Sequence, residues 1–104
     1  MSNYKVIIRT KAKFELRKIY DWYEEKQERL GTEFLQEAFK VIDDLPLTIV
    51  EHRQFIKEVR IVEIERFPYY VFYIKNDNRK HISIIAVLGE KQDMIRHIQQ
   101  RTSK

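Results

Sequence analysis

The sequence predicts an α+β fold in which a helical hairpin packs on one face of an antiparallel sheet. The 104 residues suffice for one hydrophobic core, and 43% of them are hydrophobic. After a short first strand, apolar residues recur at three- and four-residue spacing, which is typical of amphipathic helices. The second half carries runs of Val, Ile, Tyr and Phe divided by short turns, which is typical of strands. We therefore expect a single domain over residues 1–104.

The first strand is predicted from Tyr4 to Arg9, a segment that contains three consecutive β-branched residues. Thr10 follows, and its hydroxyl can accept a hydrogen bond from a free amide at the start of a helix. From Lys11 onward, helical spacing predicts an amphipathic helix that ends near Gly31, a residue suited to reversing the chain.

A second helix is predicted from about Thr32 to Leu45, where Pro46 closes it. The two helices should form a hairpin that buries its apolar side against the last predicted strand. The helix residues expected in this contact are Leu16, Ile19, Tyr23, Leu35, Ala38 and Ile42, and the strand residues are Ile82, Ile84 and Ala86.

The rest of the chain is predicted to form an antiparallel meander. Leu47 to Phe55 shows neither period and is expected to be an irregular connection. Three strands are then expected over Ile56 to Arg66, Tyr69 to Lys75 and His81 to Leu88, with turns at Phe67-Pro68 and at residues 76–78. Because a helical hairpin returns the chain toward its starting edge, we expect the second strand to run antiparallel to the first.

The last two strands are apolar on both faces, and one helical hairpin can cover only one of them. The C-terminal segment has Met94, Ile95 and Ile98 at helical spacing, so we expect a short helix over part of the second face. A partner protein is expected to cover the remainder, because exposed apolar surface of this extent marks an interaction site.

Composition excludes several classes of function. The chain has no Cys, which removes disulfides and thiol chemistry and fits a reducing cytoplasm. Two Gly residues are too few for a phosphate-binding loop. His52, His81 and His97 lack the spacing of a metal site, so we expect no metal and no cofactor. We see no export signal and no stretch long enough to span a membrane.

The net charge is +4, from 20 basic and 16 acidic residues. This excess permits nucleic-acid binding without requiring it, because an acidic protein would satisfy the same charge. Two basic clusters are expected to form an electropositive rim, and they comprise Lys75, Arg79 and Lys80 near one turn and Lys91, Arg96 and Arg101 on the terminal segment.

Several motifs, in their order along the chain, resemble the RelE/ParE superfamily of toxins from type II toxin-antitoxin, or plasmid stabilisation, systems. The resemblance extends from Tyr4 to Met94. Its most specific part is Arg66-Phe67-Pro68-Tyr69-Tyr70-Val71-Phe72-Tyr73, followed by Ile84-Ile85-Ala86-Val87-Leu88, and weaker support comes from Ile19-Tyr20-Asp21-Trp22-Tyr23, Leu30-Gly31 with Phe34-Leu35, and Val59-Arg60. Membership implies a cognate antitoxin that wraps the domain, with a homodimer or a heterotetramer as the assembly.

The family contains two activities that need different residues. RelE-like members cut messenger RNA on the ribosome without a metal, which requires basic groups around the scissile phosphate and a proton shuttle. At the corresponding positions this sequence has Ile61 and Glu63 on the second predicted strand of the chain and Tyr70 on the third, and after the last strand only Lys91 matches in charge. Many ParE-like and related members carry a His after the last strand, where this sequence has Gly89.

Because the nuclease cations are missing, the favoured hypothesis is a ParE-like toxin, which binds and poisons DNA gyrase without performing chemistry. The alternative is a ribosome-dependent nuclease that uses Arg60, Tyr70 and Lys91 as its catalytic residues. A third hypothesis is a toxin-fold relic that only binds its antitoxin. For the favoured hypothesis, the expected partner-binding residues are Arg60, Arg66, Tyr70, Phe72, Ile85, Lys91 and Arg96.

Two of these residues have a simpler structural interpretation. Arg60 can pair with Glu51, Glu58 or Glu63, because cross-strand charge pairs are common. Arg66 precedes the Phe-Pro turn and can be an ordinary solvated turn residue.

Overall fold

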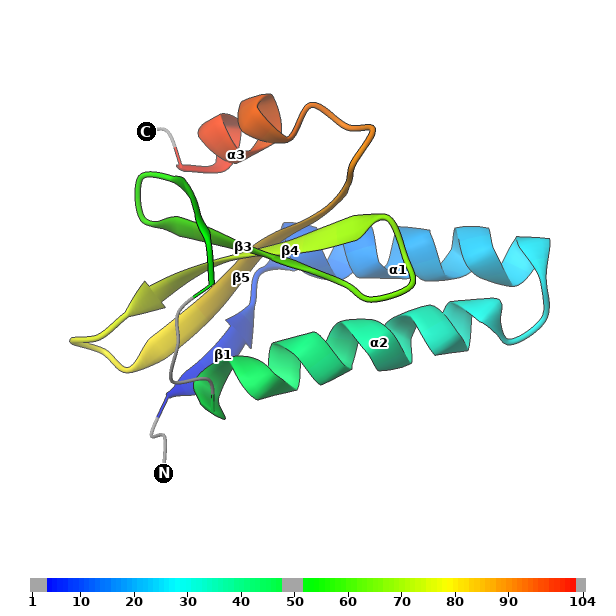
Figure 1. The fold of residues 1–104 in the computed structure, drawn as a ribbon, viewed down its shortest axis with the longest axis horizontal. Helices are drawn as coiled ribbons and strands as arrows, with labels where there is room; N and C mark the ends of the chain where they lie inside the picture. The colour runs from blue at the N-terminus through cyan, green and yellow to red at the C-terminus, as the bar shows by residue number, and fades with distance from the viewer. Residues whose placement is uncertain (1–3, 48–51, 103–104) are drawn as a thin grey trace.

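The structure is a computed structural model, which describes residues 4–47 and 52–102. Its element order confirms the predicted α+β fold: a strand, two helices, a meander and a terminal helix (Figure 1). The elements are β1 (Lys5–Ile8), α1 (Thr10–Lys26), α2 (Leu30–Asp44), the 3-10 turn η1 (Leu45–Leu47), β2 (Gln54–Ile56), β3 (Val59–Glu63), β4 (Tyr69–Asn76), β5 (His81–Gly89) and α3 (Met94–Thr102).

Within the described residues, the strands form one five-stranded sheet in the order β1-β5-β4-β3-β2. β1 pairs with β5 in parallel, and the other neighbours are antiparallel. β3 corresponds to the second predicted strand, and it runs parallel to β1 three places away in the sheet. The prediction that the second strand runs antiparallel to the first is therefore wrong. The physical reason is that the helical hairpin carries the chain across the sheet, and the meander starts at the far edge.

The short strand β2 overlaps the end of the segment that was predicted to be irregular, and it also includes Ile56, which was predicted to begin the next strand. It pairs with β3 and adds an edge to the sheet. Residues 48–51 of the same segment lie outside the described residues.

The link between the two helices differs from the prediction. α1 ends at Lys26, and Gly31 lies inside α2 with no positive φ. The left-handed residue of the connection is Arg29, with φ 72°. At the other end of α1, Thr10 is already helical and Arg9 precedes the helix without any capping bond from its side chain, so the predicted Thr10 cap is also wrong.

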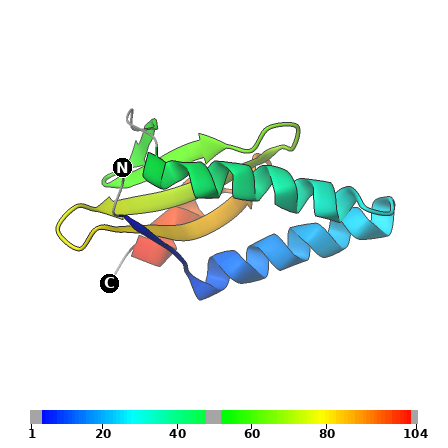
Figure 2. The same ribbon diagram turned by 90° about the horizontal axis from the view of Figure 1, so that it is seen from below.

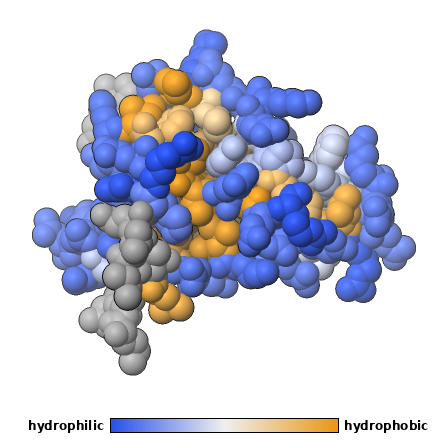
Figure 3. Space-filling model, in the orientation of Figure 1, coloured by the Kyte–Doolittle hydropathy of each residue, from blue (hydrophilic) through white to orange (hydrophobic). Residues whose placement is uncertain are grey.

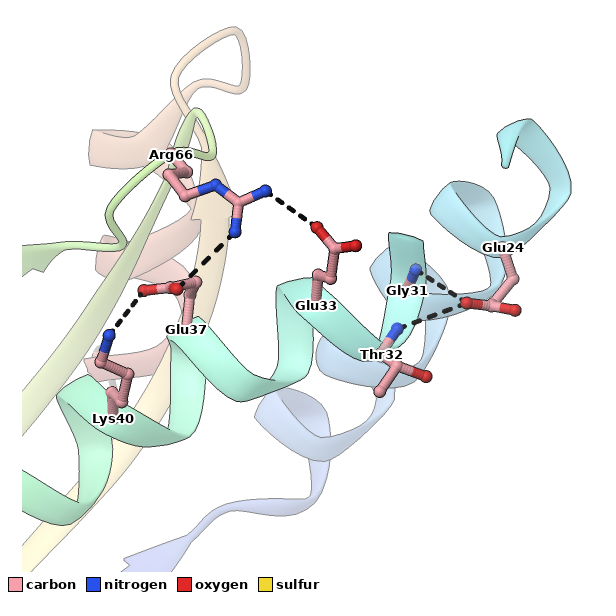
Figure 4. A network of polar contacts seen from close by, with 7 residues as sticks. All are labelled: Glu24, Gly31, Thr32, Glu33, Glu37, Lys40 and Arg66. Atoms are coloured by element: carbon pink, nitrogen blue, oxygen red, sulfur yellow. Dashed lines mark hydrogen bonds and ion pairs between the residues drawn. The ribbon is translucent and has the colours of Figure 1, made fainter. Parts of the chain in front are cut away.

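Gly31 is needed because the two helices approach closely at this point. A Cβ atom there would lie 2.5 Å from the carbonyl oxygen of Tyr20 and 2.7 Å from Cγ of Glu24. The carboxylate of Glu24 accepts hydrogen bonds from the backbone N–H groups of Gly31 at 2.8 Å and Thr32 at 3.3 Å (Figure 4). A side chain of α1 thus satisfies the free amides at the start of α2.

The sheet has a separate hydrophobic core on each face. α1 and α2 cover one face and α3 covers the other, as Figures 1 and 2 show. The hairpin core contains most of the predicted contact, namely Leu16, Ile19, Ala38, Ile42, Ile82 and Ile84, with Tyr23 and Leu35 half-buried beside it. The α3 core contains Val59, Ile61, Phe72, Ile85, Ala86, Leu88 and Ile98.

Ala86 was predicted to face the hairpin, but it belongs to the α3 core. The register explains the error. Phe72 pairs with Ala86 while Tyr73 pairs with Ile84, so Ile85 is an extra residue in β5. A β-bulge of this kind reverses the alternation of side chains, and Val87 replaces Ala86 on the hairpin face.

None of the helices in the described part of the chain is long and apolar enough to span a membrane.

Candidate partner-binding surfaces

α3 packs on the second sheet face, which confirms the prediction that the C-terminal helix covers part of this face. Ile98 of α3 and Phe72 of β4 are fully buried, and Ile85 is 7% exposed. The ring of Phe55, in β2, packs edge-on against Phe72 with centroids 5.1 Å apart. Phe72 and Ile85 were predicted to contact a partner, yet a partner would reach either side chain only if α3 moved. Tyr70 is half-buried at the margin of this core.

The turn into α3 is held by two side chains that follow β5. Asp93 accepts a hydrogen bond from the backbone N–H of Arg96 at 3.1 Å, which caps the helix. Gln92 accepts one from the backbone N–H of Gly89 at 2.8 Å. Lys91 and Arg96 lie exposed on this segment, as expected of residues that meet a partner.

Glu15 and Arg101 form an ion pair at the point where β1 stops pairing with β5. β1 pairs with β5 through Ile84, and the next residues of β5 lie at an open edge. Glu15 accepts a hydrogen bond from the backbone N–H of Val87 at 2.9 Å. Arg101 donates to the carbonyl oxygen of Ile85 at 2.9 Å, and both of its terminal nitrogens bond to the Glu15 carboxylate.

This ion pair ties α1, the free edge of β5 and α3 together. The side chain of Glu15 is only 18% exposed, and that of Arg101 is only 13% exposed. Sequence reasoning missed the pair and placed Arg101 in an open basic rim instead. The signal in the sequence is weak, because the partners are 86 residues apart and Glu15, like Glu33 and Glu37, is a helix carboxylate beside a buried residue.

The structure separates the residues of the predicted nuclease alternative. Arg60 pairs in register with Tyr73, a member of the hairpin core, and its guanidinium donates to the carbonyl oxygen of His52 at 3.0 Å. Tyr70 packs against the α3 core on the opposite face. Arg60 and Tyr70 therefore cannot converge on one phosphate, whereas Tyr70 and Lys91 lie toward the same end of the sheet.

The positions at which the nuclease branch carries cations are filled differently here. Ile61 is 4% exposed and packs in the α3 core. Glu63 is exposed and lies opposite Tyr70 in the register of β3 and β4. Among the described residues, no group of three or more His, Asp or Glu side chains could hold a metal ion.

Arg66 is engaged in ion pairs within the chain. It adopts φ 73° in the β3–β4 turn, and its guanidinium reaches Glu33 at 2.8 Å and Glu37 at 3.8 Å on α2 (Figure 4). The hydrogen bond to Glu33 is the main reason that the pKa of Arg66 is raised. The side chain remains 56% exposed, so it both anchors the turn and stays accessible to a partner.

The Phe-Pro-Tyr motif builds core structure at the far end of the hairpin. Phe67 and Tyr69 pack around Tyr23 and Phe34, with ring centroids 5.0 to 6.2 Å apart. Burial raises the pKa of the Tyr23 phenol, and the neighbouring Tyr69 raises it further. Burial also raises the pKa of Tyr69, against a smaller opposite effect of its hydrogen bond with Tyr23.

An apolar groove opens between α1, α2 and β1. The helices meet near Gly31 and diverge toward β1 (Figures 1 and 2). Figure 3 shows that apolar side chains also reach the surface on the face seen in Figure 1. The groove has a volume of about 710 Å³ and an apolar lining that comes mainly from Ile8, Leu16, Tyr20, Leu35 and Phe39. Lys13 and Arg17 are its charged lining residues. No sequence pattern indicated this groove, because it depends on the angle between the helices.

A fold of this kind, with a helical hairpin on one face of a sheet and a terminal helix on the other, is shared with several solved structures. The chain has 19% identity to the chromosomal ParDE toxin-antitoxin system from P. aeruginosa, with a TM-score of 0.72 over 83% of this chain and 95% of that chain. A mutant of the E. coli toxin RelE in the free state gives 13% identity and a TM-score of 0.59, over 93% of each chain. The toxin-antitoxin complex RelBE2 from Mycobacterium tuberculosis gives 20% identity and a TM-score of 0.56, over 88% and 97%.

The sequence itself gives the family. The model of the ParE toxin of the type II toxin-antitoxin system parDE matches residues 6–94. No curated protein sequence matches the chain. The chain belongs to the ParE toxin family, which confirms the predicted RelE/ParE membership.

Proposed function

We propose that this toxin acts in the cytoplasm by binding DNA gyrase, and that a cognate antitoxin neutralises it. The proposal rests on which residues occupy the strand positions where the nuclease branch needs cations. Ile61 is buried under α3, and Glu63 is an exposed carboxylate, which would repel a phosphate. A toxin without a converging set of cations must act by binding, because RNA cleavage depends on charge stabilisation and a proton shuttle.

The antitoxin partner is supported by the family match and by the solved relatives. The P. aeruginosa relative is a ParDE system, and the M. tuberculosis relative is a toxin-antitoxin complex. The exposed residues Lys91 and Arg96, with the accessible guanidinium of Arg66, are the predicted contacts that a partner can reach without moving α3.

The proposal is tested with purified toxin in two assays run side by side. The first measures supercoiling of a plasmid by DNA gyrase, and the second measures codon-positioned cleavage of a messenger by translating ribosomes. We expect inhibition in the first assay and no cleavage in the second. Cleavage that Lys91→Ala abolishes would contradict the proposal and establish the nuclease alternative. If the protein neither inhibits gyrase nor causes cleavage but still binds its antitoxin, it is a toxin-fold relic.

A further inference from the structure

We propose that the end of the sheet where β1 begins beside the β4–β5 turn binds the phosphate backbone of duplex DNA, without regard to base sequence. Lys5 lies next to His81 in the register, and its backbone N–H donates to the carbonyl oxygen of Lys80 at 2.8 Å. Figure 1 shows the two segments at the same end of the molecule. They bring together four cations, which we call the basic end: Lys5, Lys75, Arg79 and Lys80.

The basic end holds most of the net charge of the chain. Asp77 is the one carboxylate in residues 69–89, and residues 4–14 contain none, so the basic end with Asp77 has a charge of about +3 at neutral pH. The whole chain has a net charge of +4, and the rest of the molecule is therefore nearly neutral. A polyanion is attracted to charge gathered in this way, because neighbouring phosphates can each meet a cation.

The cations of the basic end are held by the fold around Tyr4. The ammonium groups of Lys75 and Lys80 lie 4.9 and 5.1 Å from the centroid of the Tyr4 ring. The Tyr4 hydroxyl donates a hydrogen bond to the carboxylate of Asp77, which also forms an ion pair with Lys75 at 4.0 Å. These contacts join the start of β1 to the turn, so the charges keep their arrangement at one end of the sheet.

The surface of the basic end favours a nucleic acid over a protein partner. Among the described residues, the large apolar side chains that are exposed lie elsewhere, namely Phe14, Trp22, Leu47 and Ile95. The centre of a protein interface is apolar, whereas phosphate contacts need only cations and other polar donors. The basic end has the second composition.

The same surface favours a duplex over a single strand. Proteins hold single strands by stacking the bases on aromatic rings. The ring available here is that of Tyr4, and it already carries two lysine ammonium groups. A duplex keeps its bases stacked within itself and presents phosphates at a higher density along its axis, so cations alone suffice to bind it.

The first test is the salt dependence of duplex binding by the full chain. A fluorescent duplex of arbitrary sequence is titrated with the protein, and its anisotropy is measured at several salt concentrations. About three to four phosphate contacts give a slope of about −2.7 to −3.6 in log K against log salt. The affinity should therefore fall about 40- to 150-fold between about 50 and 200 mM salt. Absence of binding at the lower salt concentration would overturn the proposal.

The second test places the contacts on the basic end. Arg79→Gln/Lys80→Gln removes two of its cations, and Lys11→Gln/Lys18→Gln makes the same change in net charge on α1. All four side chains are exposed, so both variants should keep the fold, which thermal unfolding verifies. We expect the first variant to bind at least about tenfold more weakly at about 50 mM salt, with a slope that is smaller by about 1.8. The α1 variant should keep the slope of the unchanged chain.

Two results would overturn the proposal even if the duplex binds. Equal losses in the two variants would show that net charge controls binding rather than the basic end. An equal affinity for polyglutamate or for a single strand would show that the basic end does not select a duplex. Neither gyrase nor an antitoxin takes part in these measurements, so their failure would leave the proposed function in place.

Discussion

Breaking the ion pair between Glu15 and Arg101 should loosen α3 and destabilise the whole fold. Glu15→Ala removes one bond to the Val87 N–H and the bonds to Arg101, and it leaves a largely buried guanidinium without its counter-charge. A hydrogen bond to a charged group contributes about 1.5 to 3 kcal/mol, and removing one partner of a buried pair costs about 3 to 5 kcal/mol. Because Glu15 and Arg101 are still 18% and 13% exposed, water partly solvates the guanidinium that is left unpaired. We therefore expect Glu15→Ala to lower the free energy of unfolding by about 2 to 4 kcal/mol.

The assay is a double-mutant cycle measured by urea unfolding. Arg101→Ala should cost about 1 to 3 kcal/mol, since Glu15 keeps its bond to Val87 while the carbonyl of Ile85 loses its donor. The coupling energy of the pair should be about 1 to 2 kcal/mol. In thermal unfolding, each kcal/mol lowers Tm by about 4 to 8 °C in a domain of this size.

The exposed pair of Arg17 and Asp21 provides the matched control, because it has the same chemistry on the same helix. Its side chains are 74% and 52% exposed, so its coupling energy should be about 0.3 to 0.5 kcal/mol. Equal coupling energies for the two pairs would refute the reasoning, because burial would then have no effect. Additive effects of Glu15→Ala and Arg101→Ala would refute it as well.

Three further predictions follow from the packing. Gly31→Ala should destabilise the protein by about 1 to 3 kcal/mol in urea unfolding, although Ala is intrinsically the better helix residue, because its Cβ would lie 2.5 Å from the Tyr20 carbonyl; a stabilised variant would contradict this. Leu16→Ala and Ile42→Ala should each lose about 2 to 5 kcal/mol in thermal unfolding, since both side chains are buried in the hairpin core, and losses below 1 kcal/mol would place the core elsewhere. The folded pKa values of the Tyr23 and Tyr69 phenols are raised, so their contribution to stability is complete below the unfolded pKa of about 10 and is lost as the pH rises through the folded pKa. Tyr69→Phe should therefore weaken the alkaline loss of stability, and an unchanged slope would show that burial of the phenol has no such effect.

The order of elements was predictable because periodicity is a local property of the sequence. The three- and four-residue spacing in the first half and the β-branched runs in the second indicated the hairpin and the meander. The placement of β1 was not predictable, because nothing local to Tyr4 to Arg9 distinguishes a parallel partner at β5 from an antiparallel partner at β3. The bulge at Ile85 was hidden for a related reason, since both alternating sets of β5 are apolar.

The candidate sites were less predictable than the fold, because a site depends on which charges the fold uses internally. Arg66 and Arg101 were both predicted to be open cations, and both form ion pairs within the chain. Lys91 and Arg96 have the same charge and lie exposed after β5. The sequence shows the sign of a charge, whereas only the fold shows its partner.

The buried state of Ile61 links the fold to the proposed absence of nuclease chemistry. Ile61 is 4% exposed beneath α3, so a Lys or Arg at this position would bury a charge without a partner. Such a cation could serve a phosphate only if α3 left the second face, and that would expose Phe72 and Ile98 to water. The covering helix and the apolar strand beneath it therefore depend on one another. A single substitution such as Ile61→Lys should consequently lower stability without creating cleavage activity, because the cation would be introduced into the α3 core rather than into a site.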